Sequence, residues 1–78
     1  PSADTHILVI PKMHIASLAY INDTHADIMG KFTISIPKIA KLAGLKGYKT
    51  LINTGVEGGQ EVFHIHANIL HGNIKQKY

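Results

Sequence analysis

The segment Val62–Leu70 places the tightest limit on the fold, because polar and apolar residues alternate along it. Successive side chains of a β-strand point to opposite faces, so the alternation predicts a half-buried strand with His64, His66 and Asn68 in a row on one face. The other face is apolar and is predicted to join the core: Phe63, Ile65, Ala67 and Ile69. A strand of this kind needs further elements to cover its apolar side.

Two further strands and a glycine-rich connection can be predicted. His6–Ile10 is an apolar, β-branched run that stops at Pro11, which indicates a buried strand ending at a residue without a backbone N–H. Tyr48–Asn53 is predicted as another strand, forming a hairpin with Val62–Leu70. The connection Thr54–Gln60 contains three glycines and continues neither strand.

One helix is predicted from about Asp23 to Ala43. Asn22 or Asp23 can cap its first turn, and Gly44 and Gly47 give the stop signal. Its buried stripe has spacings of four, four and three residues: Ile28, Phe32, Ile36 and Ile39. Pro37 lies inside the span, where it removes a backbone donor at a cost of about 3 kcal/mol, so we expect a kink or break near Thr33. The fold class is therefore α+β, an antiparallel sheet with one long helix packed on it.

Composition narrows the function. With 78 residues the chain forms one small domain or part of one. The lack of cysteine excludes disulfides, thiolate zinc sites and a cysteine nucleophile. The net charge of +3 comes from eight dispersed lysines without arginine, so a nucleic-acid partner is not expected. No apolar run reaches the roughly 18 residues of a membrane span and no signal peptide is evident, so we expect a cytoplasmic protein with no membrane partner.

Six histidines against five carboxylates direct attention to imidazole chemistry. A neutral imidazole on a strand can attack a phosphorus atom, and an adjacent Gly-Gly loop can present backbone N–H groups to the phosphate. His64 and His66 fit the first part, and the loop around Gly58 and Gly59 fits the second. The same two histidines with His6 could instead form a metal site, or be structural. His14, His25 and His71 are interpreted as solvent-facing or packing histidines.

Three separated segments resemble the histidine triad (HIT) family, most closely its Hint-like branch of nucleoside phosphoramidases and nucleotide hydrolases. Gly58–Leu70 is similar to the family signature His-φ-His-φ-His-φ-φ, where φ is apolar, and Thr5–Ile15 and Gly47–Gly55 match at the expected spacings. The third histidine of the signature is Asn68 here. The resemblance covers residues 1–72, which we expect to be the C-terminal portion of the family domain, and 73–78 is expected to be a loose tail.

The resemblance implies roles for individual residues. His66 matches the nucleophile that forms a covalent nucleotidyl intermediate, and the carbonyl of His64 would accept a hydrogen bond from it and fix its tautomer. Asn68 would contact the phosphate and the leaving group without donating a proton as an imidazolium does. The expected substrate-binding positions are Asn53, Gly59, Gln60, Glu61 and His6, the last packed behind the triad. Neither a cofactor nor a metal is expected, because the family's zinc site uses a Cys-x-x-Cys.

The resemblance implies a hydrolase that cleaves nucleoside phosphoramidates or related nucleoside monophosphate derivatives, with a purine nucleotide or phosphoramidate as ligand. It also implies a homodimer. An alternative is a weak or inactive HIT-like module that acts through nucleotide or protein binding, which Asn68 favours. A further alternative is a nucleotidyltransferase, since the related galactose-1-phosphate uridylyltransferases carry glutamine at the third position. Their motif has proline where this chain has Ile65.

Overall fold

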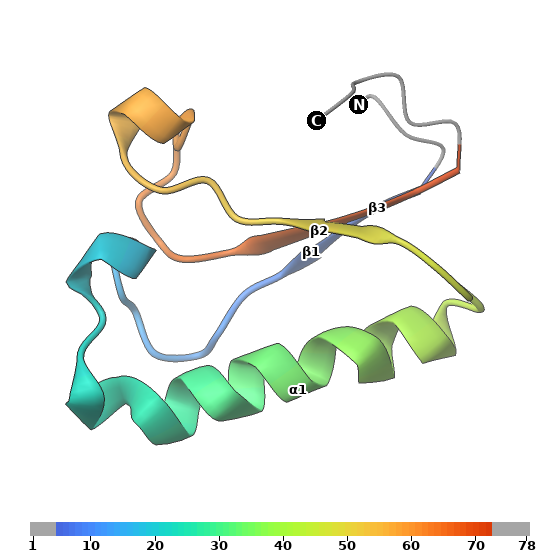
Figure 1. Cartoon of the computed structure of the whole chain (residues 1–78), viewed down its shortest axis with the longest axis horizontal. Helices are drawn as coiled ribbons and strands as arrows, with labels where there is room; N and C mark the ends of the chain where they lie inside the picture. The colour runs from blue at the N-terminus through green and yellow to red at the C-terminus, as the bar shows by residue number, and fades with distance from the viewer. Residues whose placement is uncertain (1–4, 73–78) are drawn as a thin grey trace.

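The computed structural model describes residues 5–72 and shows a three-stranded antiparallel sheet with one long helix running along one of its faces (Figure 1). The strand order is β1 (Thr5–Val9), β3 (Ala67–His71) and β2 (Lys49–Leu51). The predicted α+β class is confirmed. The tail predicted for 73–78 lies outside the described residues.

β3 occupies the centre of the sheet and is antiparallel to both neighbours. In the register, Asn68 lies opposite Leu8 of β1 and opposite Leu51 of β2. The third polar residue of the alternating segment is therefore held from both sides by backbone pairing. A residue in this position has little freedom to move along or across the sheet.

The regular part of β3 begins at Ala67, five residues later than the Val62 start predicted from the sequence. The segment before it contacts an irregular part of the chain, where the Ile65 N–H donates to the Ile15 carbonyl over 2.7 Å. Alternation nevertheless persists, because Ile65, Ala67 and Ile69 are fully buried while the polar residues between them are half-buried. The prediction for Phe63 was wrong, since 42% of its surface is exposed.

Strand β1 alternates in burial instead of being buried throughout. Val9 is buried, whereas His6 and Leu8 are exposed. The reason is that α1 (Ala26–Leu42) covers only the face of the sheet on which Val9 lies (Figure 1). The opposite face carries His6 and Asn68.

The helix starts and ends as the local chemistry predicts. A single 3₁₀ turn, Asp23–His25, precedes α1, and Asn22 caps it by accepting from the Thr24 N–H over 2.9 Å. At the other end Gly44 has φ +78°, a conformation that costs little without a Cβ. The Leu45 N–H then donates back to the Ala40 carbonyl, which closes the last turn.

The sequence predicted a kink or a break near Thr33, and Pro37 does not break the helix. α1 runs uninterrupted from Ala26 to Leu42 with Pro37 inside it. Pro37 and Thr33 both lie on the exposed side. Water can therefore solvate the Thr33 carbonyl, which has lost its usual donor, and the proline ring faces solvent instead of the packed side.

The core forms where the helix stripe meets the inner face of the sheet. Phe32 and Ile36 of α1 are buried and pack with residues of β1 and β3, while Ile28 and Ile39 are half-buried at the edge of the cluster. The predicted stripe is confirmed, with Ala40 as an additional buried member. Within residues 5–72, no helix has the length and apolar character needed to cross a membrane.

Candidate functional site

His66 is held in a defined tautomer by the backbone two residues before it. Its Nδ1 lies 2.8 Å from the carbonyl oxygen of His64. A carbonyl can only accept a hydrogen bond, so Nδ1 must carry the proton and the neutral ring has its lone pair on Nε2. The ring is half-buried, and Nε2 has no hydrogen-bond partner among the residues that the structure describes. The result is an oriented imidazole with an unprotonated nitrogen available to a ligand.

His64 is fixed by two contacts to the segment that follows β1. Its Nε2 lies 3.1 Å from the carbonyl oxygen of Pro11, which must accept from it. Its ring meets the ring of His14 edge to face, with centroids 4.7 Å apart. These contacts steady the peptide whose carbonyl orients His66. His14 was interpreted as a solvent-facing or packing histidine, and it is exposed with its ring packed against His64.

Asn68 is bound to His6 on the outer face of the sheet. The distance from His6 Nε2 to Asn68 Oδ1 is 2.7 Å, and Asn68 Nδ2 lies 3.4 Å from the Leu51 carbonyl oxygen. His6 was predicted to be packed behind the triad. It does contact the triad position, but its side chain is exposed rather than buried.

The glycine-rich connection forms a compact turn that uses its own backbone donors. The N–H groups of Gly58 and Gln60 both donate to the Gly55 carbonyl, and that of Gly59 donates to the Val56 carbonyl, at 3.0 to 3.1 Å. The expectation that these three N–H groups face an anion therefore needs correction. The next backbone N–H groups, from Glu61 to His64, have no hydrogen-bond partner within residues 5–72. Those N–H groups are therefore available to a ligand.

Asn53 ties the end of the β2 segment to this turn. Its Nδ2 donates to the Gly58 carbonyl over 2.8 Å. Gly59 has φ +84°, and a Cβ placed there would lie 3.4 Å from Asn53 Nδ2. A larger residue at position 59 would be strained and would press on this contact. Glu61 follows the turn with an exposed side chain.

Gln60 is buried, with 4% of its surface exposed, and its side-chain amide is fully used inside the protein. Oε1 accepts from the Gly55 N–H over 2.9 Å, and Nε2 donates to the carbonyls of Ala16 and Val62. The side chain predicted to bind substrate is thus a brace between the turn and the segment after β1. Through these hydrogen bonds Gln60 also positions the backbone of the residues that follow it.

Replacing Gln60 by alanine should lower the free energy of unfolding by roughly 2 to 4 kcal/mol, because three backbone groups lose their partners in a buried place. Glu61→Ala is the matched control, since its side chain is exposed, and it should change stability by less than about 0.5 kcal/mol. Urea denaturation of both variants measures the difference. Equal stability of the two would show that the amide of Gln60 is not a brace.

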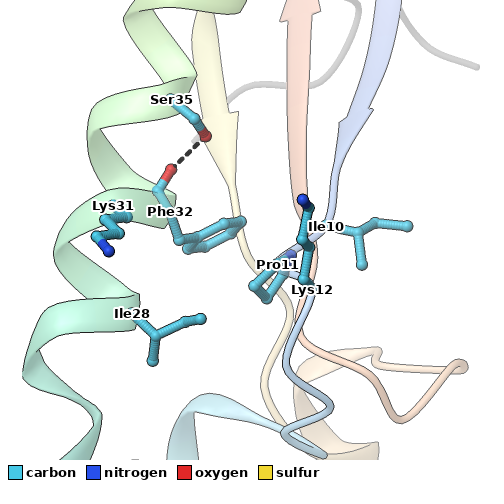
Figure 2. Close-up of a pocket in the computed structure, with 7 residues that line it drawn as sticks. All are labelled: Ile10, Pro11, Lys12, Ile28, Lys31, Phe32 and Ser35. Atoms are coloured by element: carbon cyan, nitrogen blue, oxygen red, sulfur yellow. Dashed lines mark hydrogen bonds between the residues drawn. The ribbon is translucent and has the colours of Figure 1, made fainter.

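A cleft of about 470 Å³ lies apart from the predicted site residues, between the N-terminal half of α1 and the chain after β1 (Figure 2). Its walls are mostly apolar, and they include two lysines: Ile10, Pro11, Lys12, Ile28, Lys31, Phe32 and Ser35. Pro11 belongs to both places, because its ring lines the cleft and its carbonyl accepts from His64. The sequence interpretation did not predict this cleft.

The remaining histidines have structural contacts. His25 Nδ1 accepts from the Asn22 N–H over 3.0 Å at the start of the helix, and His71 Nδ1 donates to the Gly47 carbonyl over 2.6 Å. Within the described part of the chain, no three His, Cys, Asp or Glu side chains are grouped in a way that could hold a metal ion. The chemistry that the geometry offers is that of an oriented imidazole at His66.

Comparison with known proteins identifies the family of this chain. Residues 1–73 match the HIT domain. The chain belongs to the HIT family. Among HIT proteins, it is 52% identical over 71 residues to Protein HitA of Neisseria gonorrhoeae, covering 90% of this chain and 66% of that protein. It is 39% identical over 74 residues to the purine nucleoside phosphoramidase of Escherichia coli K12, covering 92% of this chain and 62% of that protein.

Solved HIT structures have the same fold. A histidine triad protein from Clostridium difficile superposes with a TM-score of 0.87 at 44% identity, covering all of this chain (100%) and 70% of that one. A HIT family hydrolase from Legionella pneumophila gives 0.86 at 42% identity, covering 92% and 66%. The chain spans slightly less than two thirds of the length of the curated HIT relatives named above.

Proposed function

We propose that this HIT domain cleaves nucleoside phosphoramidates or related nucleoside monophosphate derivatives, with His66 as the nucleophile. The observation that carries the proposal is the 2.8 Å hydrogen bond from His66 Nδ1 to the His64 carbonyl. It leaves Nε2 unprotonated and aimed, which are the two requirements for attack on phosphorus. Two further features support phosphate binding. Asn53 is hydrogen-bonded to the glycine turn. The backbone N–H groups that follow the turn have no hydrogen-bond partner within residues 5–72 and can donate to a phosphate.

The first step forms a bond between His66 Nε2 and the α-phosphorus while the bond from phosphorus to the leaving group breaks. The bonding electron pair goes to the leaving atom, and an amine leaving group takes up a proton from water as it departs. The backbone N–H groups from Glu61 to His64, which shortly precede His66 in sequence, would donate hydrogen bonds to the phosphoryl oxygens and stabilise their negative charge. In the second step water attacks the phosphorus, the pair of the N–P bond returns to His66, and the nucleoside monophosphate leaves with release of a proton.

The relatives support the substrate class. One is named a purine nucleoside phosphoramidase and a structural neighbour is titled a HIT family hydrolase. On that ground we propose a purine nucleotide derivative as the substrate of this chain.

A second candidate is a HIT module that binds a nucleotide without turning it over. Asn68 favours it, because an amide cannot supply a proton to a departing amine. The two candidates differ in one observable. A module without turnover releases no nucleoside monophosphate, whereas the hydrolase releases it continuously.

The test is chemical. The protein is incubated with an adenosine or guanosine phosphoramidate, quenched in base, digested and analysed by mass spectrometry. We expect a nucleotidyl group on the peptide that contains His66, together with free nucleoside monophosphate. Adduct without release would favour the non-hydrolysing module. Neither adduct nor release from the phosphoramidate or from a 4-nitrophenyl ester of the same nucleotide, with an intact fold by circular dichroism, would refute the hydrolase.

We also propose a homodimer. Ile34 and Leu42 of α1 expose 57% and 89% of their surface, and a single core of this size supplies only a few kcal/mol. A symmetric contact through the helix would cover such side chains. Sedimentation equilibrium should give a dimer at micromolar concentration, and Leu42→Lys should shift it towards monomer. A stable, folded monomer of the unmodified protein would contradict this prediction.

A further inference from the structure

The contact between His6 and Asn68 joins two strands across the face that carries the triad positions. His6 pairs with Leu70 in the register, so it is a diagonal neighbour of Asn68 rather than its direct partner. The 2.7 Å distance from His6 Nε2 to Asn68 Oδ1 shows a close hydrogen bond at this diagonal. Asn68 is half-buried and two residues after His66 on the same face.

The surroundings fix which end of the Asn68 amide points where. On the β2 side it faces the Leu51 carbonyl, which only accepts, so the amide nitrogen must be the atom there. Oδ1 is then turned to His6, whose Nε2 must carry a proton to donate to it. The amide oxygen is occupied by His6, while Nδ2 has two N–H groups and only one is directed to Leu51.

We propose that His6 is a positioning residue, which holds the Asn68 amide so that an N–H rather than the carbonyl faces the leaving group of the bound substrate. The inference rests on the proposed function of His66. A neutral N–H can stabilise negative charge on a departing oxygen, but it has no proton to give to a departing amine. The site thus favours nucleoside monophosphate derivatives whose leaving group departs as an oxygen anion.

The favoured reaction balances without a general acid. His66 Nε2 bonds to phosphorus, the P–O bond to the leaving group breaks, and its electron pair remains on the oxygen as a phenolate or carboxylate. Water then releases the nucleoside monophosphate from His66 with loss of one proton. With an amine as leaving group, the same P–N cleavage requires a proton to be delivered to nitrogen, and Asn68 cannot deliver it.

The test compares two substrates that share adenosine monophosphate, the 4-nitrophenyl ester and the benzylamine phosphoramidate. The variants are His6→Phe, which keeps a ring but no donor, and His6→Gln, which keeps a donor. We expect His6→Phe to lower kcat for the ester about tenfold, a loss typical of one misplaced hydrogen bond, and so to lower the ratio of the ester rate to the phosphoramidate rate. His6→Gln should recover most of the ester rate. An unchanged ester-to-amide ratio in His6→Phe, or no recovery in His6→Gln, would overturn the inference.

A second readout does not depend on turnover. Nitrogen-15 NMR of the protein should show the Nε2–H tautomer of His6, and the side-chain amide signals of Asn68 should shift in His6→Phe and return towards their original position in His6→Gln. The opposite tautomer of His6, or unmoved Asn68 signals, would refute the positioning role. If neither substrate gives an adduct on His66 while the NMR result holds, it is the proposed function that fails and not the contact. Melting curves of both variants check that the fold is intact.

Discussion

No nucleotidylated protein should form when His66 is replaced by alanine, and turnover should fall by roughly 10⁴-fold to 10⁶-fold, the loss seen when a nucleophile is removed. The fold should be kept, because the ring of His66 is half-buried and, within residues 5–72, hydrogen-bonded only to the nearby His64 carbonyl. The measurement is the mass of the base-quenched protein together with the rate of nucleoside monophosphate release.

His71→Ala is the matched control for this experiment. It removes another half-buried histidine whose Nδ1 bonds a backbone carbonyl, that of Gly47, at the far end of β3. Adduct formation should survive in it. Adduct formation that also survived in His66→Ala would remove the nucleophile assignment.

Replacing Asn68 by histidine, the residue at the third position of the family signature, should have the second large effect on turnover. In Asn68→His an imidazolium can donate a proton to the leaving group, and such donation contributes about 100-fold to 10,000-fold. We therefore expect a gain of that order for the phosphoramidate and a much smaller one for the 4-nitrophenyl ester, whose phenolate needs no proton. The measurement is kcat/KM for both substrates.

Asn68→Gln serves as the control for that gain, because it keeps an amide and adds no proton donor. It should not accelerate amine release. Equal gains for both substrates in Asn68→His would mean that position 68 acts by orienting the phosphate rather than through its acidity.

The helix was predictable because its signals are local. Asn22 as a cap, Gly44 as the stop and the Phe32–Ile36 stripe each depend on neighbours within one or two turns. The effect of Pro37 was not, because its cost depends on whether the Thr33 carbonyl faces the core or water. That orientation is set by how the helix packs on the sheet.

The start of β3 was missed for a related reason. The alternation within Val62–Leu70 describes burial correctly from His64 to Ile69. Only backbone partners make a strand, however, and Ile65 finds its partner in the loop residue Ile15. Phe63 lies before the point at which the chain joins the sheet. Pattern alone does not show where pairing begins.

In the candidate site, the resemblance predicted the bond from His66 to the His64 carbonyl, and the structure shows it. The prediction that the glycine turn presents its backbone N–H groups to a phosphate was less accurate. Glycine indicates a tight turn, yet a tight turn consumes its own N–H groups, and those of Gly58 and Gly59 are engaged within it. The buried amide of Gln60 and the ring contact of His14 depend on segments far away in sequence, which a local pattern does not reveal.

The order in which contacts can form during folding follows from where the triad contacts lie. His6 and Asn68 are 62 residues apart, and Pro11 and His64 are 53 apart, whereas α1 is built from contacts within a few residues. Local helices form fast, and contacts that close a long loop come later because the entropy of closure must first be overcome. The helix can thus exist in a partly folded chain, but the oriented imidazole cannot. The orientation of the His66 ring is therefore a property of the closed chain, and a change that delays the meeting of β1 and β3 would slow its appearance without altering any residue that contacts this ring.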